Sequence, residues 1–230
     1  MLAFHNDPAI KAMFLARIAA HAAADEIVKG AYWENGQGCA IGCTYHTADH
    51  MASEREAGIP VALAHLEDHI FESLPNDLAM TWPHRFMSAV PVGADLGMVG
   101  PKFALWLIRD SQIPGMNHRS VKHAIEDVID VLETWCCTGL PDSGAALDAA
   151  CSAGGAATRV RSVASSHAAG AAASAADAAC KRSPFSIAQA ASSAALARSP
   201  IGFDVFTAYV KMSDALLGLI RDTEPVREAV

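Results

Sequence analysis

The sequence predicts an all-α protein, with an N-terminal helical bundle over residues 1–140 and an alanine-rich helical extension over residues 141–230. Apolar residues recur at intervals of three and four along most of the chain, which is typical of amphipathic helices. No stretch alternates apolar and polar residues for long, so we expect few strands. Alanine, the strongest helix former, dominates residues 145–199.

The expected helices begin and end at local signals. Asp7-Pro8 is a helix start, because Asp caps free N–H groups and Pro suits the first helical position, and Gly30 is a stop. Asn35-Gly36 marks a turn, and each later proline favours a new start. The expected helices cover residues 8–29, 39–57, 60–74, 77–90, 95–109, 117–137 and 203–221, with two more in 145–199 separated near Ser183-Pro184.

The composition predicts a cytoplasmic protein with reduced thiols. A net charge of −8 argues against binding to nucleic acid or to an anionic membrane surface. The first apolar run is interrupted by Arg17, so we expect no signal peptide, and no run reaches the roughly 18 apolar residues of a membrane span. Two of the six cysteines are the adjacent Cys136-Cys137, a poor disulfide framework.

Four potential metal ligands follow the glycine-rich turn: Cys39, Cys43, His46 and His50. Thiolate and imidazole are ligands that suit zinc. On one continuous helix they share a stripe, but Cys39 and His50 would lie roughly 16 Å apart at about 1.5 Å rise per residue. We therefore expect two neighbours of the stripe to bind an ion together with ligands from another helix. The alternative is that the stripe is core packing, because cysteine is often buried.

His21 and Asp25 form a second candidate, one turn apart on helix 8–29. An aspartate can orient a histidine and raise its basicity, so this pair predicts a general base for hydrolysis. The alternative is a buried polar pair that fixes the register of the helix. Further polar candidates lie on helix 60–74: His65, Glu67, Asp68, His69 and Glu72.

Cys43 is also a candidate nucleophile. It lies in the first turn of its expected helix, where the helix dipole and free N–H groups lower the pKa of a thiol. Gln37-Gly38 precedes it at an interval that resembles papain-like peptidases, in which such a glutamine helps to bind the oxyanion. This resemblance covers residues 37–43 alone.

The turn before the Cys/His helix is the expected ligand pocket. Tyr32 and Trp33 would form its wall. Gln37 and Gly38 would offer backbone N–H groups at a helix N-terminus, where anions bind readily.

The blocks HAAADEIVKGAYWENGQGCAIGCTYHTADH, GIPVALAHLEDHIFESLPN and PVGADL resemble a set of uncharacterised bacterial and phage proteins. The resemblance covers the first 140 residues and implies an alanine- and serine-rich tail, as found here, but it implies no activity. Alanine-rich helical proteins of this sort include some described as immunity proteins.

Two functional hypotheses follow. In the first, the pocket beside the Cys/His helix binds zinc or a small ligand and supports hydrolysis. In the second, the chain is a non-catalytic interaction or sequestering protein of phage–host conflict. Its alanine-rich helices would then mediate homo-oligomerisation, since small residues let helices approach closely.

Overall fold

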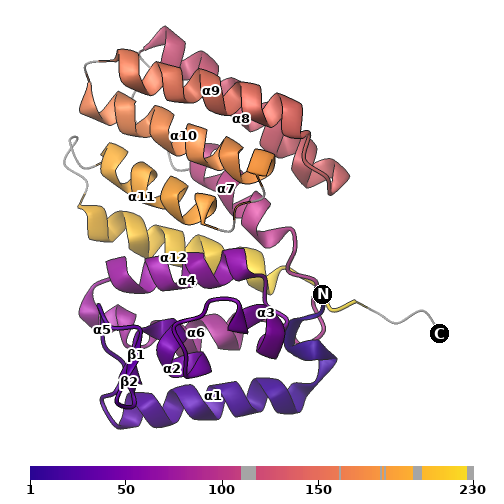
Figure 1. Ribbon diagram of the computed structural model, residues 1–230, viewed down its shortest axis with the longest axis vertical. Helices are drawn as coiled ribbons and strands as arrows, with labels where there is room; N and C mark the ends of the chain where they lie inside the picture. Colours follow the sequence, from indigo (N-terminus) through magenta and orange to yellow (C-terminus); the bar gives the residue numbers. More distant parts are fainter. Residues whose placement is uncertain (110–117, 161, 182, 184, 199–203, 227–230) are drawn as a thin grey trace. The chain divides into compact units, whose positions relative to one another are not determined.

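The computed structural model describes residues 1–109, 118–160, 162–181, 183, 185–198 and 204–226, and it confirms the all-α prediction (Figure 1). Over these ranges the strands form one small antiparallel sheet, β1 (Trp33–Glu34) with β2 (Gln37–Gly38). No helix in the described ranges is long and apolar enough to cross a membrane.

The chain divides into two compact units. Unit 1 comprises Met1–Val99 and Ser213–Val230, and unit 2 comprises Gly100–Met212. The domain boundary predicted near residue 140 corresponds to the connection between α8 (Arg119–Thr138) and α9 (Ser143–Arg159), which both belong to unit 2.

Unit 1 is built around the short helix α2. All six residues of α2 are buried, because α1, α4 and α6 pack around it. In Figure 1, α2 accordingly lies between α1 and α4. The helices of this unit are η1 (Ala3–Asn6), α1 (Pro8–Ala23), α2 (Ala40–Tyr45), α3 (Ala52–Ala57), α4 (Val61–Ser73), α5 (Asn76–Ala79), α6 (Trp82–Ala89) and the second half of α12 (Val205–Arg221).

Helix α1 is shorter than predicted. The Asp7 cap is confirmed, since its carboxylate accepts a 2.8 Å bond from the N–H of Ala9. The helix ends at Ala23, however, and Asp25 follows in the left-handed conformation with φ of 55°. The residues that follow pair with the β1–β2 hairpin, and the N–H of Val28 donates to the Gly38 carbonyl at 2.8 Å. The predicted end near Gly30 is wrong because this pairing is non-local.

The predicted helix 39–57 is wrong as a single element. Its first part, α2, ends at His46, which has the left-handed φ of 56°. Asp49 then starts a new turn, because its side chain accepts a bond from the N–H of Met51 at 2.9 Å. His50 belongs to this turn, ahead of α3. His46 and His50 are therefore not on one helical stripe.

Two glycines allow the β1–β2 hairpin to lie against α2. A Cβ atom added to Gly38 would lie 2.1 Å from the Tyr32 carbonyl oxygen, and one added to Gly42 would lie 1.6 Å from it. The same carbonyl accepts a bond from the N–H of Cys39 at 3.2 Å. The hairpin segment Tyr32-Trp33 is thereby fixed beside the start of α2.

Unit 2 is a stack of alanine-rich helices. Helix α10 packs against α8, α9 and α11, and its inward alanines are fully buried. Asp142 caps α9 by accepting bonds from two N–H groups at 3.0 Å. The helices of this unit are α7 (Val99–Arg109), α8 (Arg119–Thr138), α9 (Ser143–Arg159), α10 (Val163–Lys181), α11 (Ser186–Arg198) and the first half of α12.

The alanine-rich region holds three helices where two were predicted. The extra break lies between Arg159 and Val163, a segment without the glycine or proline that marks most breaks. The predicted helix starts at residues 117 and 203, and Pro184 at the predicted break, lie outside the described residues.

Candidate functional site

The predicted Cys/His stripe is divided among three environments, because the helix that would have aligned it is broken. Cys39 faces acidic side chains of α4, and His50 is bonded to one of them. His46 faces a histidine of α1. Cys43 faces backbone carbonyl groups.

Cys39 forms a cluster with Asp68 and Glu72. Cys39 is the N-cap of α2 and is buried, while the two acids lie one turn apart on α4. The cysteine sulfur and one carboxylate oxygen from each acid all lie within 4.8 Å of one another. Among the described residues, these three form the one group of at least three potential ligands whose donor atoms lie this close together. The cluster joins one residue of the predicted stripe to α4, and not to α1.

Asp68 has one satisfied and one unsatisfied carboxylate oxygen. Its Oδ2 accepts a 3.1 Å bond from Nε2 of His50, and both side chains are largely buried. Its Oδ1 is buried and has no hydrogen-bond partner of ordinary geometry, and the Cys39 thiol is the polar group that interacts with this carboxylate besides His50. Burying a carboxylate oxygen without a hydrogen bond costs free energy, and native structures normally provide such an atom with a partner.

The His50 ring is held between two other rings. It stacks on His65, with centroids 4.1 Å apart and planes inclined by 10°. The Tyr32 ring also contacts it in an edge-to-face arrangement, with centroids 6.2 Å apart and planes inclined by 81°. This packing directs Nε2 of His50 at Asp68.

The surroundings of the Cys39 cluster disfavour the anionic forms of its side chains. Burial, and then the charge of Asp68, raise the pKa of the Cys39 thiol above its ordinary value. Partial desolvation also raises the pKa of Glu72, whose side chain remains partly exposed and accepts the N–H of Gly30 at 3.1 Å. A cation placed among the three groups would offset these costs, because it stabilises each anionic form.

A second cluster joins His21 and His46. Nδ1 of His21 donates to the Glu26 carboxylate at 2.6 Å, and Nε2 of His21 lies 2.8 Å from Nε2 of His46. Trp33 stacks on His46, with centroids 4.5 Å apart and planes inclined by 12°. The structure does not bring the predicted partner Asp25 to His21, because Asp25 lies past the end of α1 and is exposed. Glu26 orients His21 instead.

The environment of Cys43 favours a thiol and not a nucleophilic thiolate. The side chain is fully buried, and its S–H lies within bonding distance of the carbonyl oxygens of Gly38 (3.3 Å) and Glu26 (3.5 Å). Burial raises its pKa to about 11. The neutral thiol does not attack, so this environment gives the papain-like hypothesis no support.

Tyr32 and Trp33, the predicted wall of the ligand pocket, lie beside the Cys39 cluster and the His21–His46 cluster. Tyr32 is 58% exposed and reaches His50, whereas Trp33 reaches His46. The expected anion site is not formed by the N–H groups at the start of α2. The N–H of Gly38 donates to the Glu26 carbonyl at 3.1 Å, and that of Cys39 donates to the carbonyls of the hairpin. Gln37 is exposed on β2.

Sequence reasoning did not single out Glu26 as the partner of His21, or the pairing of Cys39 with Asp68 and Glu72. The spacing of Asp68 and Glu72 was a usable signal, since residues four apart share one face of a helix. The pairing with Cys39 depends on how α2 packs on α4, which no local pattern contains.

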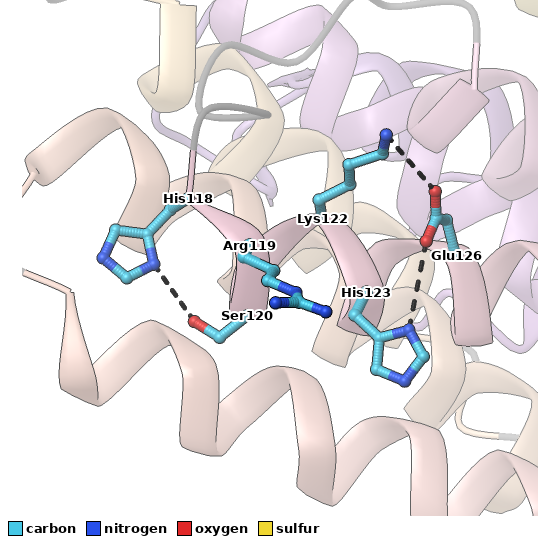
Figure 2. Close-up of a pocket in the computed structure, with 6 residues that line it drawn as sticks. All are labelled: His118, Arg119, Ser120, Lys122, His123 and Glu126. Carbon is cyan, nitrogen blue, oxygen red and sulfur yellow. Dashed lines mark hydrogen bonds and ion pairs between the residues drawn. The ribbon is translucent and has the colours of Figure 1, made fainter.

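A separate surface hollow lies in unit 2 at the start of α8 (Figure 2). His118 contacts Ser120 at 3.1 Å, and Glu126 lies within 3.9 Å of Lys122 and His123. Every one of these side chains is exposed, so water screens their charges. All come from a single helix, and they enclose no buried polar group.

Comparisons with protein-family models, with curated proteins and with solved structures each found no match to this chain.

Proposed function

We propose that unit 1 binds a divalent transition-metal ion, with zinc as the first candidate, through Cys39, Asp68 and Glu72. The observation that carries this proposal is the buried Oδ1 of Asp68, which lacks a hydrogen-bond partner while its residue lies in a cluster of three potential ligands. His50 supports the site by fixing the other oxygen of Asp68, as outer partners of metal ligands commonly do.

The donor set favours zinc over magnesium or calcium. A thiolate with two carboxylates suits a borderline-soft ion, whereas the hard ions prefer oxygen alone. Bond lengths of about 2.0–2.3 Å place the ligand atoms of a tetrahedral zinc site about 3.3–3.8 Å apart. The ligand atoms of the cluster lie within 4.8 Å of one another, so small side-chain rotations would bring them to these distances.

Three protein ligands leave one position of a tetrahedral ion open. Catalytic zinc sites also have three protein ligands. They hold water in the fourth position, where the ion lowers the pKa of that water to about 7. Glu72 is exposed, so solvent reaches this side of the cluster. We therefore propose hydrolysis of a small molecule, with the exposed Tyr32 ring as its contact surface.

The test is zinc stoichiometry. Untagged protein is dialysed against Zn²⁺, and bound zinc is measured for the wild type, for Asp68→Asn/Glu72→Gln, and for Asp148→Asn as an exposed control on α9. We expect the double variant to lose one zinc equivalent and the control to lose none. Equal zinc content in all three proteins would overturn the proposal.

Hydrolysis is tested separately on the zinc-loaded protein. A panel of chromogenic carboxylic and phosphate esters is offered to the wild type and to the double variant. Turnover that requires zinc and is abolished in the double variant would support the proposed reaction. Zinc binding without such turnover would leave a metal-binding protein and overturn the hydrolase part.

A further inference from the structure

We propose that His21 and His46 form a second metal site in unit 1, for an imidazole-preferring ion of the Cu²⁺ type. This site shares no ligand with the Cys39 cluster, so it goes beyond the function proposed above. It joins the end of α1 to the end of α2, two elements that are separate in sequence.

The two Nε2 atoms face one another across a hydrogen bond, which a bound ion would replace. The Nε2 atoms are 2.8 Å apart, and the rings are nearly perpendicular, with 86° between their planes. Two nitrogens bound at about 2.0 Å to one ion lie about 2.8 Å apart when cis in a tetragonal complex, and about 3.3 Å apart in a tetrahedral one. The observed spacing is closer to the tetragonal case, which Cu²⁺ and Ni²⁺ prefer over zinc.

The Glu26 carboxylate sets the tautomer and the basicity of His21 for metal binding. Because Nδ1 of His21 donates its proton to the Glu26 carboxylate at 2.6 Å, the lone pair of a neutral ring lies on Nε2. A carboxylate behind a histidine is the usual outer partner of a metal-binding imidazole, and it raises the basicity of the ligand atom.

His46 is held in place by its backbone and by Trp33. Its φ of 56° and ψ of 37° put a non-glycine residue in the left-handed region, which costs about 1–2 kcal/mol. Stacking against Trp33 fixes the ring plane. Such strain persists where the surrounding structure requires a particular orientation, and here the result is a ring directed at His21.

The charges around the pair are of both signs. The ionisable groups that act on His46 are Arg17, His21 and Glu56, and Glu26 adjoins His21. Burial, followed by Arg17, lowers the pKa of His46, and the neutral imidazole is the form that binds metal. The Arg17 guanidinium donates to the Thr44 carbonyl at 2.8 Å, and the Glu26 carboxylate accepts from His21 on the other side of the pair. His46 is exposed, so water can fill the remaining coordination positions.

The test is Cu²⁺ binding to the full, untagged chain, followed by electron paramagnetic resonance. We expect a signal with coupling to two nitrogens, lost in His21→Ala and in His46→Ala. Glu26→Gln should weaken binding about 10–100-fold. His123→Ala, an exposed histidine of α8, is the matched control and should leave the signal unchanged.

The two proposed sites are separated by their variants. Asp68→Asn/Glu72→Gln should keep the two-nitrogen signal, so failure of the zinc proposal would not remove it. A wild-type signal that survives in His46→Ala would overturn the second site. The proposal also fails if Cu²⁺ leaves the ring resonances of His21 and His46 unbroadened, because the pair would then be a simple hydrogen bond.

Discussion

Burial governs the chemistry of individual side chains in unit 1. Cys43 and Asp68 show two outcomes of it. The Cys43 thiol keeps its proton and lies against two carbonyl oxygens, whereas the Asp68 carboxylate is buried with one oxygen unsatisfied. Cys43 is a core residue whose polar atom has partners. Burying Asp68 costs free energy that a bound cation would offset.

The raised pKa of Cys43 predicts slow alkylation. With a pKa near 11 instead of 9, the thiolate fraction at neutral pH is about 100-fold smaller, and it rises about tenfold per pH unit until pH approaches 11. We expect mass spectrometry after iodoacetamide treatment at pH 7 to find Cys137 and Cys151, which are exposed, modified long before Cys43. Labelling of Cys43 as fast as Cys151 at pH 7 would contradict this account.

Asp68→Asn should have opposite effects with and without metal. The amide oxygen can still accept from His50, and the substitution removes a carboxylate from a largely buried position, so we expect the metal-free protein to gain on the order of 1 kcal/mol in free energy of unfolding. Zinc should stabilise the wild type and should stabilise this variant much less. Urea unfolding with and without Zn²⁺ measures both. Equal zinc stabilisation of the two proteins would remove Asp68 from the site.

The helices show what local sequence signals can predict. The cap predicted at Asp7 accepts an N–H bond, and the regular run of α4 agrees with its apolar spacing, whereas the cap at Asp142 was not predicted. The breaks at Asp25 and His46 are not visible, because neither position carries glycine or proline. Each break depends on contacts with the hairpin or with another helix.

These breaks also explain why the site was predicted only in part. The residue types were found in the sequence, but the single stripe of Cys39, Cys43, His46 and His50 assumed a continuous helix. The actual neighbours of Cys39 come from α4, and those of His46 come from α1 and β1. Which helices pack together is a property of the tertiary fold, and it decides which ligands meet.

The contact between α2 and the hairpin predicts a marked difference between two glycines. Gly42→Ala would place a methyl group on the Tyr32 carbonyl, so we expect a loss of about 2–3 kcal/mol in free energy of unfolding. Gly218→Ala, in the second half of α12, meets nothing within 4 Å and should gain up to about 1 kcal/mol. Urea unfolding of the two variants tests this. Similar stability for both would show that the close approach at Gly42 does not limit packing.

At the scale of the whole molecule, unit 1 is completed by both ends of the chain. The segment Gly93–Asp95 pairs with Leu2 and Ala3 on one side, and with Pro225 and Val226 on the other. The sequence suggested a contiguous bundle over residues 1–140, because composition changes there. A unit assembled from distant segments leaves no such change in composition.

Removing the end of the chain should therefore disturb unit 1. We expect a chain that stops at Met212 to unfold at a lower temperature and to lose zinc affinity, because it lacks the part of α12 and the bridge that belong to this unit. Asp214→Asn is the control, since its pair with Arg85 is exposed and worth little. A truncated chain with unchanged melting and zinc binding would show that residues 213–230 are not part of unit 1.

The central claim is that Cys39 is a metal ligand together with Asp68 and Glu72. Co²⁺ substitution tests it most directly, because cobalt bound by a thiolate shows a sulfur-to-metal charge-transfer band in the near ultraviolet. We predict this band in the wild type and in Cys43→Ser, and its loss in Cys39→Ser and in Asp68→Asn/Glu72→Gln. A band that persists in Cys39→Ser, or its absence from the wild type at saturating Co²⁺, would contradict the account.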